Sequence, residues 1–428
     1  MQKRLRRFKL AIHEIKNDAQ AFDLFSPDFK SFNFLRTREF LRTWEFFMKQ
    51  ENLVKKLTEF EPSGFPFISL YLNTEPNENG KFNFDVFVRQ QLSEKASEFE
   101  TETTERESFN RDAERINQFL ETIQPSTRGV AIFACAGADD YFEAREYEVP
   151  FEENNFFVFD RPHLFPLARL IDQNPIYAVV LADTSTAHIY AFKRGHIIEK
   201  EDIENIKTNG TKVGGWSQMR YQRHLENFHM LHAKEIVEEL AKIVREDGIK
   251  QIILAGDETG IIPTLREQLP KELEEKVIDV LRLNVNTPEH ELMEAAEQAV
   301  RQNDTLVDKE KIDYLKEQNY DDGLGVAGAE KTLAALSSGQ VLELYVSADF
   351  NNIEYNPKKV YKVLNAYAPG EDGEIPDIRK TGTITEEILR RGFATADNVR
   401  FIEDANLLEE FGGVGAILRY KMDGGQIV

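Results

Sequence analysis

Short, wholly apolar runs alternate with long helical patterns in the middle of this chain, and this alternation limits the fold class more than any other feature. The runs at 176–182 and 252–255 are continuously apolar, which is typical of strands covered on both faces. Between them, from about 218 to 245, apolar residues recur at helical spacing. The alternation predicts an α/β fold built from packed layers.

The length of the chain predicts several such layered units. A chain of 428 residues is too long for one hydrophobic core. We predict three α/β domains at 1–165, 166–303 and 304–428, the first of them rich in Phe. Within these domains we expect strands at 66–73, 129–135, 141–149, 176–182, 187–193, 277–280, 341–347 and 399–402, helices at 35–60, 85–122, 287–302, 329–336 and 386–391, a further helix opening the third domain near 304, and a linker-like stretch at 154–166.

The charge and composition exclude several functional classes. The net charge of -22 argues against non-specific binding to nucleic acid. A local basic patch can still bind RNA, because salt screens charges beyond about 8 Å. The chain has no apolar run of 18 residues, so we expect no membrane span. The single cysteine, Cys135, lies in an apolar run and cannot form an internal disulfide, which fits a cytoplasmic protein.

A glycine-containing loop at 210–223 is the strongest functional signal. Gly214 and Gly215 allow the backbone to approach a ligand closely. Four Lys or Arg and no Asp or Glu lie between Ile206 and Leu225. A cationic loop that leads into a helix N-terminus is suited to a phosphorylated ligand. The candidate residues are Lys212, Gly214, Gly215, Trp216, Ser217, Gln218, Arg220, Arg223 and His224.

Simpler interpretations stand beside the functional one. Gly214-Gly215 can form an ordinary turn, Ser217 can be a helix N-cap, and Trp216 can pack against its own domain or stack on a base. The helical histidines at 224, 229 and 232 lack the cysteine or carboxylate partners of a metal site, so we predict no metal and no cofactor.

Two carboxylates and two groups of glycines are further features of the sequence. Asp183 and Asp257 each follow an apolar strand and can hold Mg²⁺ for a nuclease, although Asp is also a common turn residue. No phosphate-binding fingerprint surrounds the glycines of the third domain, which we expect to serve backbone packing. They are Gly323, Gly325, Gly328, Gly412, Gly413 and Gly415.

The second and third domains resemble the archaeo-eukaryotic peptide-chain release factor family, most closely its bacterial and archaeal branch. The resemblance lies in the strand ending with Ala182-Asp-Thr184, the loop Gly214–Gln218 before Arg220–His224, and the strand ending at Asp257. In the third domain it lies in 325–336 and 412–420. It covers about 260 residues and implies a ribonuclease-H-like middle domain and a ribosomal-protein-like α/β sandwich at the end, as in Pelota.

The resemblance also implies an activity. Family release factors present a Gly-Gly-Gln tip that hydrolyses the ester between peptide and tRNA. In this chain Gln218 comes two residues later than in that tip, as it does in related quality-control peptidyl-tRNA hydrolases. The catalytic candidates are therefore Gly214, Gly215, Ser217 and Gln218, and Lys212, Trp216, Arg220, Arg223 and His224 are the candidate RNA contacts.

Three functions remain open from the sequence. The first is hydrolysis of peptidyl-tRNA or rescue of stalled ribosomes through the Gly214–Gln218 loop. The second is non-catalytic binding to ribosome or RNA, as in Pelota. The third is a nuclease acting on tRNA ends. The expected partners are the ribosome and tRNA, with a translational GTPase as a further candidate.

Overall fold

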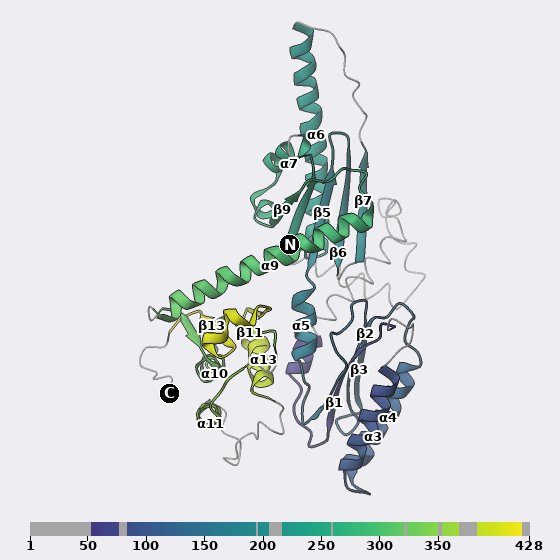
Figure 1. The fold of residues 1–428 in the computed structure, drawn as a ribbon, viewed down its shortest axis with the longest axis vertical. Coiled ribbons are helices and arrows are strands. Elements are labelled where there is room, and N and C mark those ends of the chain that lie inside the picture. The colour runs from purple at the N-terminus through teal and green to yellow at the C-terminus, as the bar shows by residue number, and fades with distance from the viewer. Residues whose placement is uncertain are drawn as a thin grey trace, which may run out of the picture. The chain divides into compact units, whose positions relative to one another are not determined.

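The computed structural model describes residues 53–76, 84–193, 196–204, 216–257, 260–320, 323–349, 353–367 and 383–421. In these ranges the strands form three sheets, each packed against helices (Figure 1). The predicted α/β class is therefore confirmed. No helix in the described ranges is both long and apolar enough to cross a membrane.

The first sheet is antiparallel, with the strand order β3-β2-β1-β4. Two helices cover one face, where Phe109 and Ile116 of α4 pack on Leu70 and Ile132 of the sheet. The opposite face is aromatic around Tyr71. The elements are β1 (Phe67–Asn73), α3 (Phe84–Glu98), α4 (Thr104–Leu120), β2 (Gly129–Cys135), β3 (Tyr141–Tyr147) and β4 (Asn155–Phe159).

The second sheet has the strand order β7-β6-β5-β8-β9 and is covered on both faces. The central strand β5 pairs in parallel with β8 and antiparallel with β6. This double coverage explains why β5 and β8 are apolar along their whole length. The elements are β5 (Ile176–Ala182), β6 (Thr186–Lys193), β7 (His196–Glu204), α6 (Trp216–Glu246), β8 (Gln251–Gly256), α7 (Ile261–Gln268), α8 (Lys271–Glu274), β9 (Val277–Leu281) and α9 (Glu289–Tyr320).

The third sheet has the strand order β10-β13-β11-β12. One face is covered by α10, α11, α13 and also α5, whose Phe165 and Ala168 belong to the same apolar core. Ile312 and Leu315 of α9 pack on the other face. The elements are α5 (Phe165–Gln173), β10 (Gly325–Ala327), α10 (Ala329–Ser337), β11 (Val341–Ser347), α11 (Pro357–Tyr367), α13 (Ile384–Thr395), β12 (Asn398–Ile402), the 3-10 turns at Ala405–Leu407 and Glu409–Phe411, and β13 (Val414–Leu418).

Two predictions for the first domain were wrong. The stretch at 154–166 was expected to be a linker, but it contains β4, which pairs with β1 at the sheet edge because Phe156–Phe159 is a short apolar run. The helix expected at 85–122 is two helices, α3 and α4. The second begins after Thr103, whose hydroxyl caps it by accepting a hydrogen bond from the Arg106 backbone N–H.

The two helices expected on either side of residue 303 are one continuous helix, α9. Asp304 does not interrupt it, because its carboxylate accepts a hydrogen bond from the amide of Gln251 at 3.1 Å and lies 3.4 Å from the guanidinium of Arg400. One boundary of the predicted three-domain division thus falls inside α9, and the other falls at the start of α5. The division itself stays a prediction.

The segment between β4 and α5 is fastened to both the first and the third sheet regions by buried hydrogen bonds. Glu386 of α13, only 4% exposed, accepts hydrogen bonds from the backbone N–H groups of Leu164 at 2.6 Å and Phe165 at 2.9 Å. The neighbouring His163 donates its backbone N–H to the hydroxyl of Ser69 on β1 at 3.0 Å. Three consecutive residues thus join β1 to α13.

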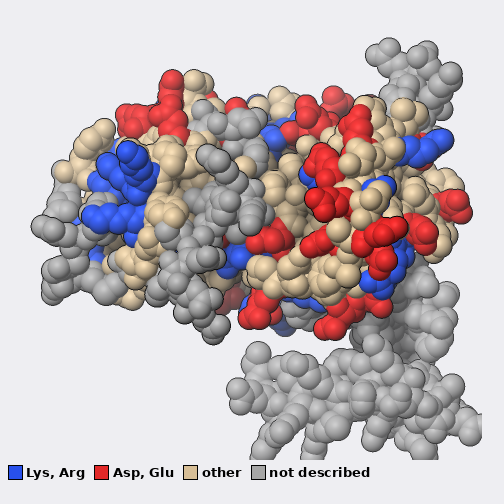
Figure 2. All heavy atoms as spheres, turned by 90° about the horizontal axis from the view of Figure 1, so that it is seen from below, with Lys and Arg blue, Asp and Glu red and all other residues tan. Residues whose placement is uncertain are grey.

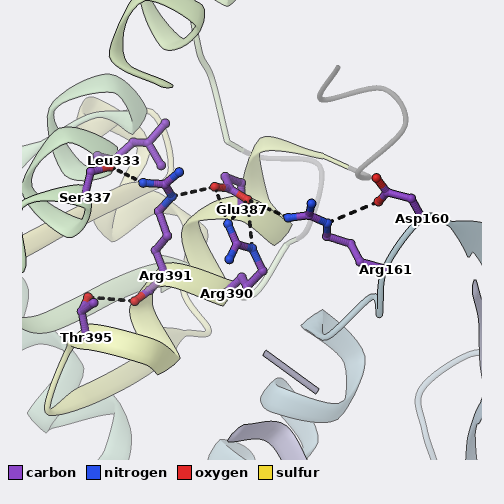
Figure 3. Close-up of polar contacts among 8 residues, drawn as sticks. All are labelled: Asp160, Arg161, Leu333, Ser337, Glu387, Arg390, Arg391 and Thr395. Atoms are coloured by element: carbon purple, nitrogen blue, oxygen red, sulfur yellow. Dashed lines mark hydrogen bonds and ion pairs between the residues drawn. The ribbon is translucent and has the colours of Figure 1, made fainter. Parts of the chain in front are cut away.

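A second carboxylate of α13, Glu387, is surrounded by arginines (Figure 3). Arg390 donates to both of its oxygens at 2.7 Å, and Arg391 donates from Nε at 2.6 Å. Arg161, from the segment after β4, lies 4.0 Å away. Burial alone would raise the pKa of Glu387, but Arg390 and Arg391 hold it below its ordinary value. Glu387 is therefore an ionised centre of this network.

We expect the region around Glu386 to lose stability as the pH rises. Burial raises the pKa of Glu386 from 4.5 to about 7, even though the two N–H donors lower it. The folded state therefore holds the proton more tightly, and stability that is fully present below pH 4.5 is lost as the pH rises through about 7. From the size of this shift, the loss between about pH 5 and pH 8 is roughly 2 kcal/mol.

Hydrogen exchange at the amides of Leu164 and Phe165 measures this contact directly. After correction for intrinsic exchange rates, their protection should fall from about pH 5 to about pH 8 in the wild type. In the Glu386→Gln variant, which has no titratable group at this position, protection should vary much less over the same range. An equal pH dependence in both proteins would contradict the assignment to Glu386.

Candidate functional site

The long helix α6 connects the candidate loop to the second sheet. Its C-terminal half is anchored in the core through Ala233, Ile236, Leu240 and Ile243. These positions recur at helical spacing, as the apolar pattern of the sequence predicts. The predicted helix, 218–245, therefore corresponds to α6 with small differences at both ends.

The N-terminal half of α6 extends beyond that core (Figure 1). No side chain described between Arg223 and Leu231 is buried, and Leu231 is 63% exposed. The first buried side chain described in α6 is His232. At 1.5 Å per residue, the part of α6 before His232 is about 24 Å long. The start of the helix is thus held well away from the sheet to which its other end is anchored.

The predicted site residues fall on this extension or just before it. Lys212, Gly214 and Gly215 lie outside the described residues. Arg223 is described and exposed. The others lie in the first turns of α6, where the structure describes the backbone and leaves the side chains out. They are Trp216, Ser217, Gln218, Arg220 and His224.

The interpretation of Ser217 as a helix N-cap was wrong. Helix α6 begins at Trp216, so Ser217 is inside its first turn rather than at the residue that precedes it. The backbone N–H groups of the first four residues of a helix have no partner within the helix. In α6 these belong to residues 216–219, and no acidic residue lies in this first turn. The backbone therefore offers a set of N–H donors at the positive end of the helix dipole.

Helical periodicity separates the candidate residues onto two sides of α6. Successive residues are rotated by about 100°, so positions 216, 220 and 223 fall on one side. Position 218 is rotated by about 200° from position 216 and falls on the opposite side. The two candidate phosphate-binding arginines and the candidate glutamine thus occupy different sides of one helix.

His232, at the buried end of this extension, and Asp183 both have structural roles. His232 is 1% exposed, and burial lowers its pKa, which keeps the imidazole neutral. Asp183 accepts hydrogen bonds from the backbone N–H groups of Ser185 and Thr186, both at 2.7 Å, and so fixes the turn between β5 and β6. This supports the turn interpretation of Asp183.

The metal alternatives find no support in the structure. Asp257 follows β8, and the register Ala182↔Gly256 places it at the same sheet edge as Asp183. In the part of the chain that the structure describes, no group of three or more His, Cys, Asp or Glu residues could hold a metal ion.

Two glycines of the third domain, Gly325 and Gly415, pack closely, as predicted. A Cβ atom on Gly325 would lie 2.7 Å from the backbone N of Asn319, and one on Gly415 would lie 2.6 Å from Leu315. Gly412 and Gly413 have φ of +63° and +81°, values that other residues rarely adopt. These glycines shape the backbone around β10 and β13.

Sequence reasoning did not single out the helix α11. It carries Lys358, Lys359 and Lys362 and no Asp or Glu. Figure 2 shows basic side chains gathered over this part of the surface. The signal was available in the sequence as three lysines within five residues of a strongly acidic chain.

Comparison with known proteins gives consistent matches. Residues 162–301 match the Bacterial archaeo-eukaryotic release factor family 10. Peptide chain release factor subunit 1 of Archaeoglobus fulgidus is 24% identical over 415 residues, covering 90% of this chain and 98% of that protein. The same factor of Methanocaldococcus jannaschii is 25% identical over 416 residues, covering 87% of this chain and 97% of that protein.

The solved structures are more distant. S. cerevisiae Dom34, a translation termination-like factor, matches with 12% identity over 73% of this chain and 94% of its own, at a TM-score of 0.38. This similarity is too weak to support an argument about the site. The sequence similarity to the archaeal release factors, by contrast, extends over most of the chain.

Proposed function

This chain belongs to the archaeo-eukaryotic release factor family, and we propose that it acts at the ribosome, in the cytoplasm, to hydrolyse peptidyl-tRNA or rescue stalled ribosomes. The observation that carries the proposal is the extension of α6. Gly214 and Gly215 directly precede a helix start that stands about 24 Å beyond its core, by the rise of 1.5 Å per residue. Such a tip can enter a crowded site while its domain stays outside.

The chemistry of ester hydrolysis fits the groups at this tip. Water attacks the carbonyl carbon of the ester, the bond to the tRNA oxygen breaks, and the products are a free peptide carboxylate and a tRNA hydroxyl. The intermediate carries an oxyanion, which N–H donors aimed at it stabilise. The backbone N–H groups of residues 216–219 are candidate donors, and the Gln218 amide is the candidate group for positioning water.

The cationic residues would hold RNA rather than take part in the reaction. Positions 220 and 223 fall on the side of α6 opposite to position 218. Arg220 and Arg223 can therefore bind phosphates of tRNA or ribosomal RNA while Gln218 is available to the ester. Lys212, Trp216 and His224 would add contacts along the same segment. A translational GTPase is a further proposed partner.

Peptide release from stalled complexes tests the proposal. Purified protein is incubated with ribosome–nascent-chain complexes, and free peptide is separated from peptidyl-tRNA over time. We expect release at a rate that rises with protein concentration and saturates. No release under conditions in which an archaeal release factor is active on its own substrate would refute the hydrolytic function.

The second candidate function is binding to the ribosome without catalysis. Gln218 lies inside a helix, with two residues between it and the glycine pair, and this position favours the second candidate. Under it, the protein co-sediments with ribosomes and releases no peptide. The nuclease function falls behind both, because the described residues offer no metal ligand set.

Replacement of Arg220 and Arg223 by Ala should weaken ribosome binding under either function. A plot of log K against log salt concentration has a negative slope. If both arginines contact phosphates, this slope should become shallower by about 1.5, since each phosphate contact contributes about 0.7–0.9. Co-sedimentation across a salt series measures this. The matched control replaces Arg89 and Arg266, which are both exposed, and should leave the slope unchanged. Equal slopes in both double variants would contradict the RNA contact.

A further inference from the structure

The helix α11 in the third sheet region has one buried side and one basic side. Val360, Val363 and Leu364 are at most 4% exposed and belong to the core under the sheet. Lys358 and Lys362 lie one helical turn apart on the opposite side, with Lys359 at its flank, and all three are exposed. The core packing therefore fixes which way the lysines face.

The charge of these lysines is not balanced by ion pairs within the part of the chain that the structure describes. Among the described residues, most charged side chains near α9, α10 and α13 form ion pairs, as Lys311 does with Glu343 and Arg391 does with Glu387. None of the three lysines of α11 forms an ion pair with another described residue. Like charges one turn apart destabilise a helix by a few tenths of a kcal/mol. The arrangement is thus unfavourable in isolation and becomes favourable when an anion binds.

Two carboxylates lie near the beginning of the helix, and neither forms a direct ion pair with Lys358. Glu330 and Glu354 line a hollow together with Tyr355, Asn356, Pro357 and Lys358. The Glu330 carboxylate is engaged, because it accepts a hydrogen bond from the Asn356 backbone N–H at 2.8 Å. Toward the other end, Lys362 has no acidic neighbour within α11.

Exposed aromatic rings accompany the lysines. Tyr361 is 45% exposed and lies on the same side of α11 as Lys358 and Lys362, and Tyr355, just before the helix, is 41% exposed. Lysine is depleted at protein–protein interfaces, whereas nucleic-acid interfaces are strongly positive. Aromatic rings beside a basic surface are typical of proteins that stack the bases of single strands. The combination favours RNA over an acidic protein.

We propose that the face of α11 formed by Lys358, Lys359, Tyr361 and Lys362 is a second RNA-binding surface, which contacts phosphates through the lysines and an unpaired base through Tyr361. It is separate from the candidate tip at the start of α6, in both sequence and core. It would let the chain hold RNA at two places. The inference does not depend on catalysis at the tip.

Binding of a fluorescein-labelled, 20-nucleotide single-stranded RNA to the full chain tests the proposal. In the triple variant Lys358→Ala, Lys359→Ala, Lys362→Ala, the salt slope of log K should fall by about 2, since each single-strand phosphate contact contributes about 0.7. The control triple variant replaces Lys234, Lys250 and Lys309, which are exposed and change the net charge equally. Equal slopes in the two triple variants would overturn the proposal.

The variant Tyr361→Ala separates RNA from an acidic partner. It should weaken binding of the labelled RNA about tenfold, in line with the loss of one stacked base, while Tyr361→Phe should bind like the wild type. Competition with a polyglutamate peptide of equal charge provides the second measurement. If the peptide displaces the RNA at equal charge concentration and Tyr361→Ala has no effect, the surface binds an acidic protein and the RNA assignment is wrong. Circular dichroism checks that each variant is folded.

Discussion

A Glu387→Ala variant is expected to lose about 3 kcal/mol of stability in the region around α13, the largest loss we expect from a single charged residue. Glu387 is 8% exposed and serves Arg390, Arg391 and, at longer range, Arg161. Removing it leaves the partly buried guanidinium groups of Arg390 and Arg391 without their carboxylate partner, while Arg161 keeps its pair with Asp160. An uncompensated charge in a buried network costs far more than the loss of a surface pair.

Denaturant unfolding, followed by hydrogen exchange in α13 and α10, measures this loss. Exchange is the better probe because a chain with several cores need not unfold in one step. Glu297→Ala is the matched control, since it removes a carboxylate from the exposed pair with Arg301 and should cost at most about 0.5 kcal/mol. Similar losses in the two variants would show that the Glu387 network does not stabilise this region.

The effect of Glu387→Ala should also depend on pH. Because the arginines lower the pKa of Glu387, its contribution is present above the ordinary glutamate pKa and is lost as the pH falls through the lowered value. The difference in free energy of unfolding between the wild type and the variant should therefore become smaller as the pH falls. Glu386 behaves in the opposite way, because burial raises its pKa and the stability that it contributes is lost as the pH rises. Two adjacent residues of α13 thus respond to pH in opposite directions.

The sequence predicts the buried strands most reliably. The bounds of β2, β5 and β11 match the predicted ranges. Strands β2 and β5 are continuous apolar runs, and β11 is apolar except for Glu343 and Ser347. The edge strand β4 was missed because its run of four apolar residues is followed by Asp160 and Pro162, which indicate a loop. Edge strands bury fewer side chains, so their apolar pattern in the sequence is weaker.

Long-range partners explain the other differences. Nothing local shows that α9 continues through Asp304, because the partners of that carboxylate, Gln251 and Arg400, come from β8 and β12. The role of Glu386 as a cap for the start of α5 is equally hidden, since more than 200 residues separate it from Leu164. Periodicity predicts elements, but it does not predict contacts of this kind.

The candidate site is predictable only where local periodicity determines it. The helical register of α6 follows from its apolar stripe, which His232, Ile236 and Leu240 continue into the core. The length of the extension does not follow from that stripe, because Leu225 and Phe228 fit the pattern and yet are only half-buried. The roles of Gly214 to Gln218 stay predictions that activity measurements must decide.

Replacement of Gln218 by Ala is expected to lower the rate of peptide release at least about 100-fold, the usual cost of removing one group that stabilises or positions the reacting atoms. The loss should appear in the rate at saturating protein rather than in ribosome affinity. The reason is that position 218 falls on the side of α6 opposite to Arg220 and Arg223, which would carry the binding.

Gln222→Ala is the matched control for this variant. It removes the same side chain one turn further along α6, on the same side of the helix, so it tests whether any glutamine there matters. We expect release close to that of the wild type. If Gln218→Ala also releases peptide at close to the wild-type rate, Gln218 does not position the water, and the free N–H groups at the helix start become the remaining catalytic candidates. If wild-type protein binds ribosomes without release, the non-catalytic function is selected.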